Sequence, residues 1–283
     1  MAKVSIMTMV FGHSLEDGAL TDAAMFDYLQ QMGFDGVELP ARHLIGEPKR
    51  LKKYATLLAD SPLRVTCIDA SCNFIAPDEA TRSMGVDAVH AAIELAWAFG
   101  CSLVLAAGSH LSAGIAPDDG RRMITEGLQA CLPAAHQADV TLAIEDFGVA
   151  PTLQCAARDC LEILEAAPEV GFVFDTGNFY FCGEDPIANL ELLGERTVHV
   201  HLKDWVKSER PEIADVAGAP LGTGLIPNER LVRRFLDLGH VASFSLEVGA
   251  PGDKLQAARR DIETLRGWLE SQQTESGPTP EAP

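Results

Sequence analysis

Two histidines and a lysine–aspartate pair share one short apolar stretch, residues 198–205, which reads Val-His-Val-His-Leu-Lys-Asp-Trp. Apolar residues alternate with the histidines, so we expect a strand with His199 and His201 on the same face. Lys203 and Asp204 follow where that strand would meet solvent. Buried imidazoles need polar partners, and a metal ion or a bound substrate can supply them. A pair of hydrogen-bonded core histidines is the alternative.

Carboxylates stand at the ends of other apolar segments in the same way; these are Glu38, Glu145 with Asp146, Asp175 and Glu247. Burying unpaired carboxylates is costly, and a divalent cation is their simplest common partner. Three carboxylates and one histidine form an oxygen and nitrogen donor set that suits Mn²⁺, Co²⁺ or Mg²⁺ and admits Zn²⁺. Ion pairs with Lys203, with arginines or with backbone groups are the alternative.

The elements that would position these side chains follow from the hydrophobic pattern. Apolar segments are expected as strands at 3–11, 36–39, 64–71, 102–107, 140–147, 170–174, 197–202 and 243–248. Amphipathic helical patterns lie between them and after the last one. Nearly continuous apolar strands are typical of parallel sheets, and eight strand–helix units predict one (β/α)8 TIM barrel.

An open doubly wound sheet is the competing arrangement. It predicts a Gly-rich dinucleotide turn after the first strand, and the chain instead reads Phe11-Gly12-His13-Ser14. We therefore expect one barrel over residues 1–270, with its chemistry at the carboxyl ends of the strands. The polar, Pro-rich residues 271–283 are expected to form a disordered tail.

Composition narrows the possible partners and the compartment. The net charge is −19, from 41 acidic and 22 basic side chains, so nucleic acid and anionic membranes are not expected partners. The first residues lack the plan of a signal peptide, and no stretch approaches the ~18 apolar residues needed to span a bilayer. Seven cysteines without a C-x-x-C pair indicate reduced thiols and a cytoplasmic protein.

The chain resembles the xylose isomerase-like barrel superfamily, also called the sugar phosphate isomerase/epimerase family. The resemblance spans residues 3 to about 269 and is carried by 33–39, 142–146, 174–178, 198–204, 220–224 and 245–247. It implies one divalent metal ion, with Mn²⁺ favoured, and four ligands: Glu145, Asp175, His201 and Glu247. It also implies that Glu145 and Glu247 are the acid/base pair, and that the protein is a homo-oligomer, since members are often dimers or tetramers.

Other residues near the strand ends are candidates for binding a substrate; they are Glu38, Asn178, His199, Trp205 and Asp204. Asn178 stands where ketose 3-epimerases have a histidine, three residues after the aspartate ligand. Lys203 could stabilise an enediolate as a cation, or form a salt bridge to Asp204 or Asp175. Trp205 could wall a sugar ring or pack under a loop. His13 and His110 follow the first and fourth strands and could edge the pocket.

The family resemblance and the donor set together predict an enzyme. The leading prediction is a metal-dependent isomerase or epimerase of a sugar or keto-sugar, which abstracts a proton next to a carbonyl through a metal-bound enediolate. The alternative is a metal-dependent lyase or dehydratase on a keto-sugar, a 3-keto-glycoside or a cyclitol. A DNA repair endonuclease is disfavoured by the negative charge and by only eight histidines. A non-catalytic binding barrel is disfavoured by Glu145 and Glu247.

Overall fold

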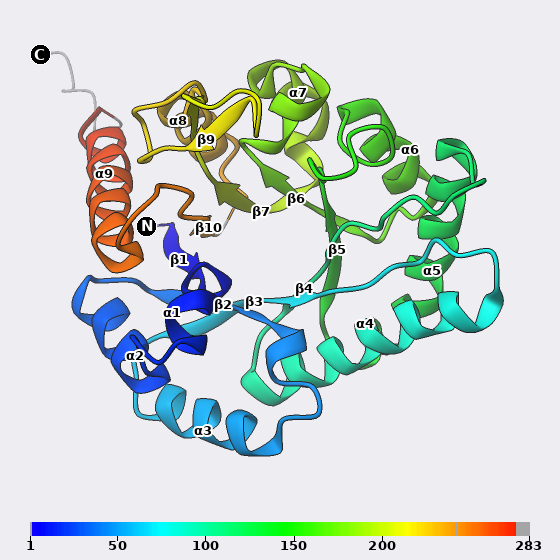
Figure 1. The fold of residues 1–283 in the computed structure, drawn as a ribbon, viewed down its shortest axis with the longest axis horizontal. Coiled ribbons are helices and arrows are strands. Elements are labelled where there is room, and N and C mark those ends of the chain that lie inside the picture. The colour runs from blue at the N-terminus through cyan, green and yellow to red at the C-terminus, as the bar shows by residue number, and fades with distance from the viewer. Residues whose placement is uncertain (1, 242, 276–283) are drawn as a thin grey trace, which may run out of the picture.

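Eight parallel strands close into a barrel, and helices surround it (Figure 1). The structure is a computed structural model that describes residues 2–241 and 243–275. Around the ring the strands follow the order β1, β10, β7, β6, β5, β4, β3, β2. Their bounds are β1 (Lys3–Met7), β2 (Gly36–Pro40), β3 (Arg64–Ala70), β4 (Leu103–Ala106), β5 (Thr141–Glu145), β6 (Gly171–Asp175), β7 (Thr197–Leu202) and β10 (Ser243–Leu246). The predicted TIM barrel is confirmed.

The helices lie outside the barrel and cover the strands. Their bounds are α1 (Gly12–Glu16), α2 (Asp22–Gln31), α3 (Pro48–Ala59), α4 (Glu79–Phe99), α5 (Pro117–Gln137), α6 (Ala157–Ala166), α7 (Pro186–Leu193), α8 (Asn228–Leu238) and α9 (Lys254–Glu275). Local signals fix several ends. The Thr21 hydroxyl and the Asp78 carboxylate accept backbone N–H groups at the starts of α2 and α4. Gly100 ends α4 in the left-handed region, at φ 65°.

The first strand and the last helix differ from their predicted bounds. β1 ends at Met7, opposite Glu38 of β2, rather than at residue 11. Beyond this pair the chain turns into a 3₁₀ helix, Thr8–Phe11, although β2 itself runs on to Pro40. At the other end α9 runs to Glu275, so residues 271–275 of the predicted tail are helical. The rest of that tail, 276–283, lies outside the described residues.

A small antiparallel sheet follows β7 where the sequence predicted only a loop. β8 (Trp205–Lys207) pairs with β9 (Val216–Gly218), and Val206 lies opposite Ala217. Each strand has only three residues, which is too short for an alternating pattern to be recognised in the sequence. This hairpin is separate from the barrel sheet and continues directly from the residues at the end of β7.

The inside of the barrel contains polar side chains from β7 and from the nearby strands β1, β2 and β10. Bulky branched side chains usually fill a TIM barrel. Here the inward-facing residues include five buried polar side chains: Ser5, Glu38, His199, His201 and Ser245. The apolar core lies instead between the strands and the helices. The barrel interior therefore contains buried, hydrogen-bonded polar side chains as well as apolar ones.

Two predictions about environment can be compared with the described residues. The seven cysteines all fall within this part of the chain and are free thiols, and six of them are buried. None of the described helices has the length and apolar character needed to cross a membrane.

Candidate active site

Three of the four predicted metal ligands come together at the carboxyl ends of neighbouring strands. Glu145 ends β5, Asp175 ends β6, and His201 lies opposite Asp175 in the β6–β7 pairing. One ligand atom from each of these residues lies within 4.8 Å of the others. All three side chains are buried. The register of the parallel strands therefore brings two carboxylates and an imidazole to one place.

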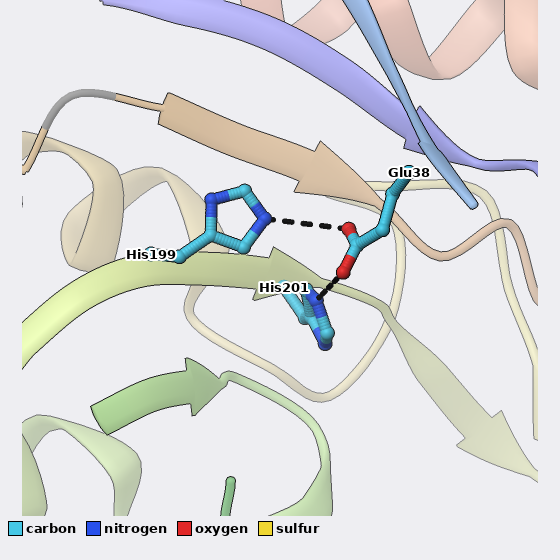
Figure 2. A group of neighbouring side chains, drawn as sticks. All are labelled: Glu38, His199 and His201. Carbon is cyan, nitrogen blue, oxygen red and sulfur yellow. Dashed lines mark hydrogen bonds and ion pairs between the residues drawn. The ribbon is translucent and has the colours of Figure 1, made fainter. Parts of the chain in front are cut away.

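Glu38 holds the His201 ring through its Nε2 atom. His201 Nε2 lies 3.0 Å from Glu38 Oε1 (Figure 2). Its Nδ1 lies 3.5 Å from Glu145 Oε2. Nδ1 has no hydrogen-bond partner. Burial alone would raise the pKa of Glu38, but His201 and His199 outweigh it and hold that pKa well below its usual value. An ionised Glu38 fixes the ring so that Nδ1 faces the carboxylates, as metal-binding histidines require.

Glu38 and His199 are fully enclosed in the barrel, and neither lines the cavity described below. His199 Nε2 lies 3.3 Å from Glu38 Oε2, and His199 Nδ1 lies 2.7 Å from Ser243 Oγ. Both residues therefore lie in the barrel interior rather than on the cavity wall. His199 is a hydrogen-bonded histidine of the barrel interior, and Glu38 positions His201. The sequence could not show this because Glu38 and His201 are 163 residues apart.

The fourth predicted ligand, Glu247, reaches the cluster through Lys203. The Lys203 ammonium lies 2.8 Å from Asp175 Oδ2 and 2.6 Å from Glu247 Oε2. It also donates a hydrogen bond to Asn178 Oδ1 at 3.4 Å. Gly177 makes room for the lysine chain, since a Cβ there would lie 2.4 Å from Lys203 Cγ. Lys203 therefore forms one of its predicted alternatives, the salt bridge to Asp175.

Negative charge exceeds positive charge around Asp175. Burial raises the pKa of Asp175 to about 7 although Lys203 opposes this, and Glu247 adds to the rise. Burial also raises the pKa of Asp146, which accepts the Asp175 backbone N–H at 2.8 Å. Burial opposes ionisation of Glu247, but Lys203 keeps the pKa of Glu247 below its usual value. Lys203 is thus shared by several carboxylates, and the negative charge of these carboxylates would accommodate a further cation.

A cavity of about 550 Å³ opens above these groups. Glu145, Asn178, Lys203 and Glu247 line one part of it, so these predicted residues meet at one space. Its other lining residues include Arg42, Asp69, Ser71, Asn73, His110 and Phe147. The predicted position of His110 agrees with this lining, whereas the His13 side chain is 93% exposed and does not line the cavity.

The sequence analysis did not include Asp69 among the strand-end carboxylates, although its position in the sequence could have indicated it. It lies near the end of β3, as Glu145 and Asp175 do on their own strands. The predicted strand ran on to Ser71, so this carboxylate was not counted as a strand-end residue. Arg42 was missed because it follows β2 in a short 3₁₀ helix that has no sequence pattern of its own.

Asp204 holds the chain that follows the hairpin by accepting hydrogen bonds from its backbone. Its Oδ2 accepts the N–H groups of Gly222 and Gly224, and its Oδ1 accepts those of Trp205 and Ile226. The side chain is 1% exposed and does not line the cavity. Four backbone donors occupy the Asp204 oxygens, so in the structure this side chain holds the loop after the hairpin.

Trp205 packs beside Lys203 rather than lining the cavity. Its Nε1 donates to the Gly177 carbonyl at 2.9 Å, and its ring lies 5.8 Å from the Lys203 ammonium. The Phe181 ring meets it edge-on, with centroids 5.6 Å apart. In the structure Trp205 is packed against Lys203 and Phe181, and its contact with a sugar ring stays a prediction. The Trp205 ring supports the lysine through a cation–π contact.

The residues present fit a divalent cation. Two buried atoms at the cluster, His201 Nδ1 and Asp175 Oδ2, have no hydrogen-bond partner, although Asp175 Oδ2 is ion-paired with Lys203. Glu145 supplies a third donor within 4.8 Å. Carboxylate oxygens with one imidazole nitrogen suit Mn²⁺, Co²⁺, Mg²⁺ or Zn²⁺. Of these three residues, Glu145 lines the cavity, so a molecule in the cavity would contact the cluster at Glu145.

Comparison with known proteins shows what the chain is similar to. L-ribulose-5-phosphate 3-epimerase UlaE of Salmonella paratyphi A is 24% identical, over 87% of this chain and 88% of its own length. The structure of IOLI protein with a binding zinc atom has a TM-score of 0.78 and 17% identity, and covers 95% of this chain and 99% of its own. The 3-keto-D-glucoside 4-epimerase YcjR from E. coli has a TM-score of 0.74 and 15% identity, and covers 94% and 100%.

At these identities the two solved structures show a shared fold alone. The family itself is shown by the sequence. The profile described as Xylose isomerase-like TIM barrel matches residues 26–271, which include β2 to β10 and the residues Glu145, Asp175, His201, Lys203 and Glu247. The closed barrel, the strand-end carboxylates and this match agree, and the chain belongs to the xylose isomerase-like TIM barrel family.

Proposed function

We propose that the protein is a divalent-metal-dependent isomerase or epimerase that acts on a sugar or keto-sugar. The observation that carries the proposal is the cluster of Glu145, Asp175 and His201 beside the cavity, with Lys203 and Glu247 joined to it. The similarity to a ribulose-phosphate 3-epimerase supports the same reaction class.

The proposed ligands are Glu145, Asp175, His201 and Glu247. The favoured ion is Mn²⁺, since carboxylates dominate the donor set, and Co²⁺, Mg²⁺ and Zn²⁺ are the alternatives. A structural relative carries zinc, and this supports a divalent ion without deciding which one. When bound, the cation polarises the carbonyl and hydroxyl oxygens of the substrate and so acidifies the C–H bond between them.

The chain's own residues perform the proton transfers in this proposal. Glu145 and Glu247 both line the cavity, and one removes the proton from the carbon next to the carbonyl. Lys203 is charged, because Asp175 and Glu247 raise its pKa although burial opposes this. It can therefore stabilise the negative charge that develops on the substrate oxygen. The second glutamate returns a proton, and the carbon and face that receive it decide between isomer and epimer.

The proposal is tested in D₂O with Mn²⁺-loaded protein and a panel of ketoses: D-fructose, D-tagatose, L-ribulose and L-ribulose 5-phosphate. Proton NMR is expected to show deuterium next to the carbonyl of at least one sugar, together with an epimer or aldose product. Chelator treatment and Glu145→Gln should both abolish this exchange. Growth of a conjugated enone absorbance would support the lyase alternative. Deuterium exchange that persists after chelator treatment would contradict the proposal. Absence of exchange with every sugar of the panel would contradict it as well.

A further inference from the structure

Arg42 places a positive charge on the wall of the cavity. It belongs to the 3₁₀ helix that follows β2, Ala41–His43, and its side chain is exposed where it lines the cavity. The guanidinium donates to Ser71 Oγ at 3.3 Å, and Ser71 lines the same cavity. Within the part of the chain that the structure describes, Arg42 forms no ion pair. Most of its N–H donors therefore remain available to a ligand.

The charge of Arg42 is not neutralised by the other charged groups of the cavity wall. Among the described lining residues, Lys203 is the other one with a fixed positive charge, and it is ion-paired with two carboxylates of the candidate active site. Asp69 also lines the cavity, but burial and Glu38 raise the pKa of its carboxyl group well above the usual value. A protonated Asp69 leaves the positive charge of Arg42 to be balanced from outside.

The wall around Arg42 adds neutral hydrogen-bond donors. Asn73 lines the cavity, and its Oδ1 accepts the Ile75 N–H at 3.1 Å, so its side chain presents the amide N–H groups to a ligand. His110 lines the cavity as well, and its ring meets the Phe147 ring edge-on with centroids 5.6 Å apart. A guanidinium with hydroxyl, amide and imidazole donors beside it is a set of groups that suits the oxygens of a phosphate or a carboxylate.

Arg42 and the acidic cluster stand on opposite sides of the barrel mouth. Arg42 follows β2, which ends at Pro40, and Asp175 ends β6. Strands β2 and β6 are diametrically opposed in the ring, with β3, β4 and β5 between them on one side and β1, β10 and β7 on the other. A molecule whose carbonyl end lies at Glu145 and Lys203 would therefore extend its other end towards Arg42. An anionic group there would not add negative charge to the cluster.

We propose that Arg42 binds an anionic group, a phosphate ester or a carboxylate, at the end of the substrate remote from the carbonyl, and so selects charged keto-sugars over neutral ones. This inference rests on the proposed sugar-converting function and names its substrate class. The planar guanidinium presents paired N–H donors that match the oxygens of either anion. Arg42 is thus a specificity-determining residue that takes no part in the proton transfers.

The test compares neutral ketoses with anionic sugars of the same carbon skeleton, in Mn²⁺-loaded wild type, Arg42→Met and Arg42→Lys. The pairs are L-ribulose with L-ribulose 5-phosphate, D-fructose with D-fructose 6-phosphate, and D-fructose with D-fructuronate. In the wild type, kcat/KM for one anionic sugar should exceed that of its neutral partner by about 10- to 100-fold. Arg42→Met should lose this preference and keep the wild-type kcat/KM on the neutral sugar. Arg42→Lys should keep part of the preference, since it retains the charge without the paired donors.

The pair that shows the preference identifies the anion. A preference for a sugar phosphate would assign a phosphate ester to the site at Arg42, and a preference for D-fructuronate would assign a carboxylate. Equal kcat/KM for neutral and anionic sugars in the wild type would overturn the inference. A preference that survives in Arg42→Met would overturn it as well, because the anion would then be held elsewhere, for example by the metal ion.

Controls separate a local effect from a change in overall charge or in metal loading. Arg64→Met removes another exposed arginine, which lies at the start of β3, donates to the Ser61 and Leu63 carbonyls and does not line the cavity. This variant should keep the preference of the wild type. Mn²⁺ affinity, measured by titration calorimetry, should be the same in Arg42→Met and the wild type. A lower Mn²⁺ affinity in Arg42→Met would overturn the inference, since the loss would then come from the metal site.

A wild type that converts neither neutral nor anionic sugars would contradict the proposed function and would leave Arg42 to be tested by binding. D-sorbitol, D-sorbitol 6-phosphate and D-gluconate would then be titrated into the Mn²⁺-loaded protein by calorimetry. One of the two anions should bind the wild type at least about 10-fold more tightly than D-sorbitol, and Arg42→Met should remove this difference. No such difference in the wild type, or the same difference in Arg42→Met, would overturn the inference about Arg42 too.

Discussion

Two groups of charged side chains in this molecule are each built around an aspartate, and they are balanced differently. Asp22, at the start of α2, lies 2.8 Å from Lys53 and 3.3 Å from Arg50 of α3. It also accepts the Tyr54 hydroxyl at 2.9 Å. Burial raises the Asp22 pKa, but these partners outweigh it and the pKa is lowered. Two cations serve one carboxylate, and both oxygens are engaged.

Asp175 has the opposite balance. It shares one lysine with Glu247, Glu145 lies close by, and its pKa is raised to about 7. The neighbouring His201 has no hydrogen-bond partner at Nδ1, although Glu145 Oε2 lies 3.5 Å away. A cluster that satisfies its own charges joins two helices, whereas a buried cluster with too little positive charge can accept a cation from outside. The comparison indicates which acidic group of a chain is structural and which can bind a ligand.

The largest expected effect comes from removing the central carboxylate of each cluster. Asp175→Asn should weaken Mn²⁺ binding more than about 100-fold and abolish sugar conversion. Removing a residue that only hydrogen-bonds to a metal ligand typically costs about 10- to 100-fold in metal affinity, and loss of a ligand should cost more. Asp22→Asn should leave Mn²⁺ affinity unchanged and reduce the free energy of unfolding by about 1–3 kcal/mol. Calorimetric Mn²⁺ titration and urea unfolding measure the two quantities. Equal Mn²⁺ affinity in both variants would remove the distinction between the clusters.

A smaller loss is expected when the shared lysine is removed. Lys203→Met should lower kcat by about 10²- to 10³-fold, because a charge stabilising the developing oxyanion is lost. It should also destabilise the metal-free protein by about 3–5 kcal/mol, since buried carboxylates lose their partner, and added Mn²⁺ should restore part of that loss.

Lys207→Met is the matched control for the lysine variant. Lys207 is exposed in β8, contacts Tyr180 Oη and does not line the cavity. This variant should behave as the wild type in turnover assays and in thermal melts with and without Mn²⁺. A Lys203→Met protein with normal kcat would show that the lysine only balances charge.

The position of His201 provides the third test. Glu38→Gln keeps a hydrogen-bonding group near Nε2 but removes the charge, and Mn²⁺ affinity should fall about 10- to 100-fold. The loss should exceed that of Ser243→Ala, which removes only the partner of His199 Nδ1. Equal affinities in the two variants would mean that Glu38 does not orient the ligand.

The smallest effect concerns the alkaline stability of the balanced cluster. Burial and Asp22 raise the pKa of Tyr54 from 10.0 to about 12. The folded pKa exceeds the unfolded one, so this contribution is complete below pH 10 and is lost as pH rises through 12. The loss is at most about 3 kcal/mol, at about 1.4 kcal/mol per pKa unit. Urea unfolding from pH 9 to 12 should show a smaller decline in Tyr54→Phe, and identical declines would contradict this assignment.

Much of the fold could be predicted from the sequence because it depends on local patterns. Each barrel strand is a short apolar run, and eight such runs alternating with amphipathic helices specify closure. The strand-end positions of Glu145 and Asp175 follow directly from the same runs. The β8–β9 hairpin could not be recognised, since two three-residue strands carry no period.

The partners within the site could not be predicted, because they depend on contacts across the barrel. Lys203 reaches both Asp175 and Glu247 only where Gly177 leaves space for its chain. Glu38 resembled a substrate-binding residue at a strand end, yet it points inward to two histidines of β7. Sequence patterns show which residues stand at an end, and side-chain reach decides which of them meet.

The bond between Glu38 and His201 has a consequence for how the protein matures. It joins β2 to β7 across 163 residues of chain (Figure 2). During synthesis the ribosome delivers β2 long before β7, so the fully oriented imidazole cannot exist until most of the polypeptide has emerged and the ring has closed. An ion that needs this imidazole as a ligand could therefore bind only at the end of folding, and fragments that stop before β7 lack the oriented histidine altogether.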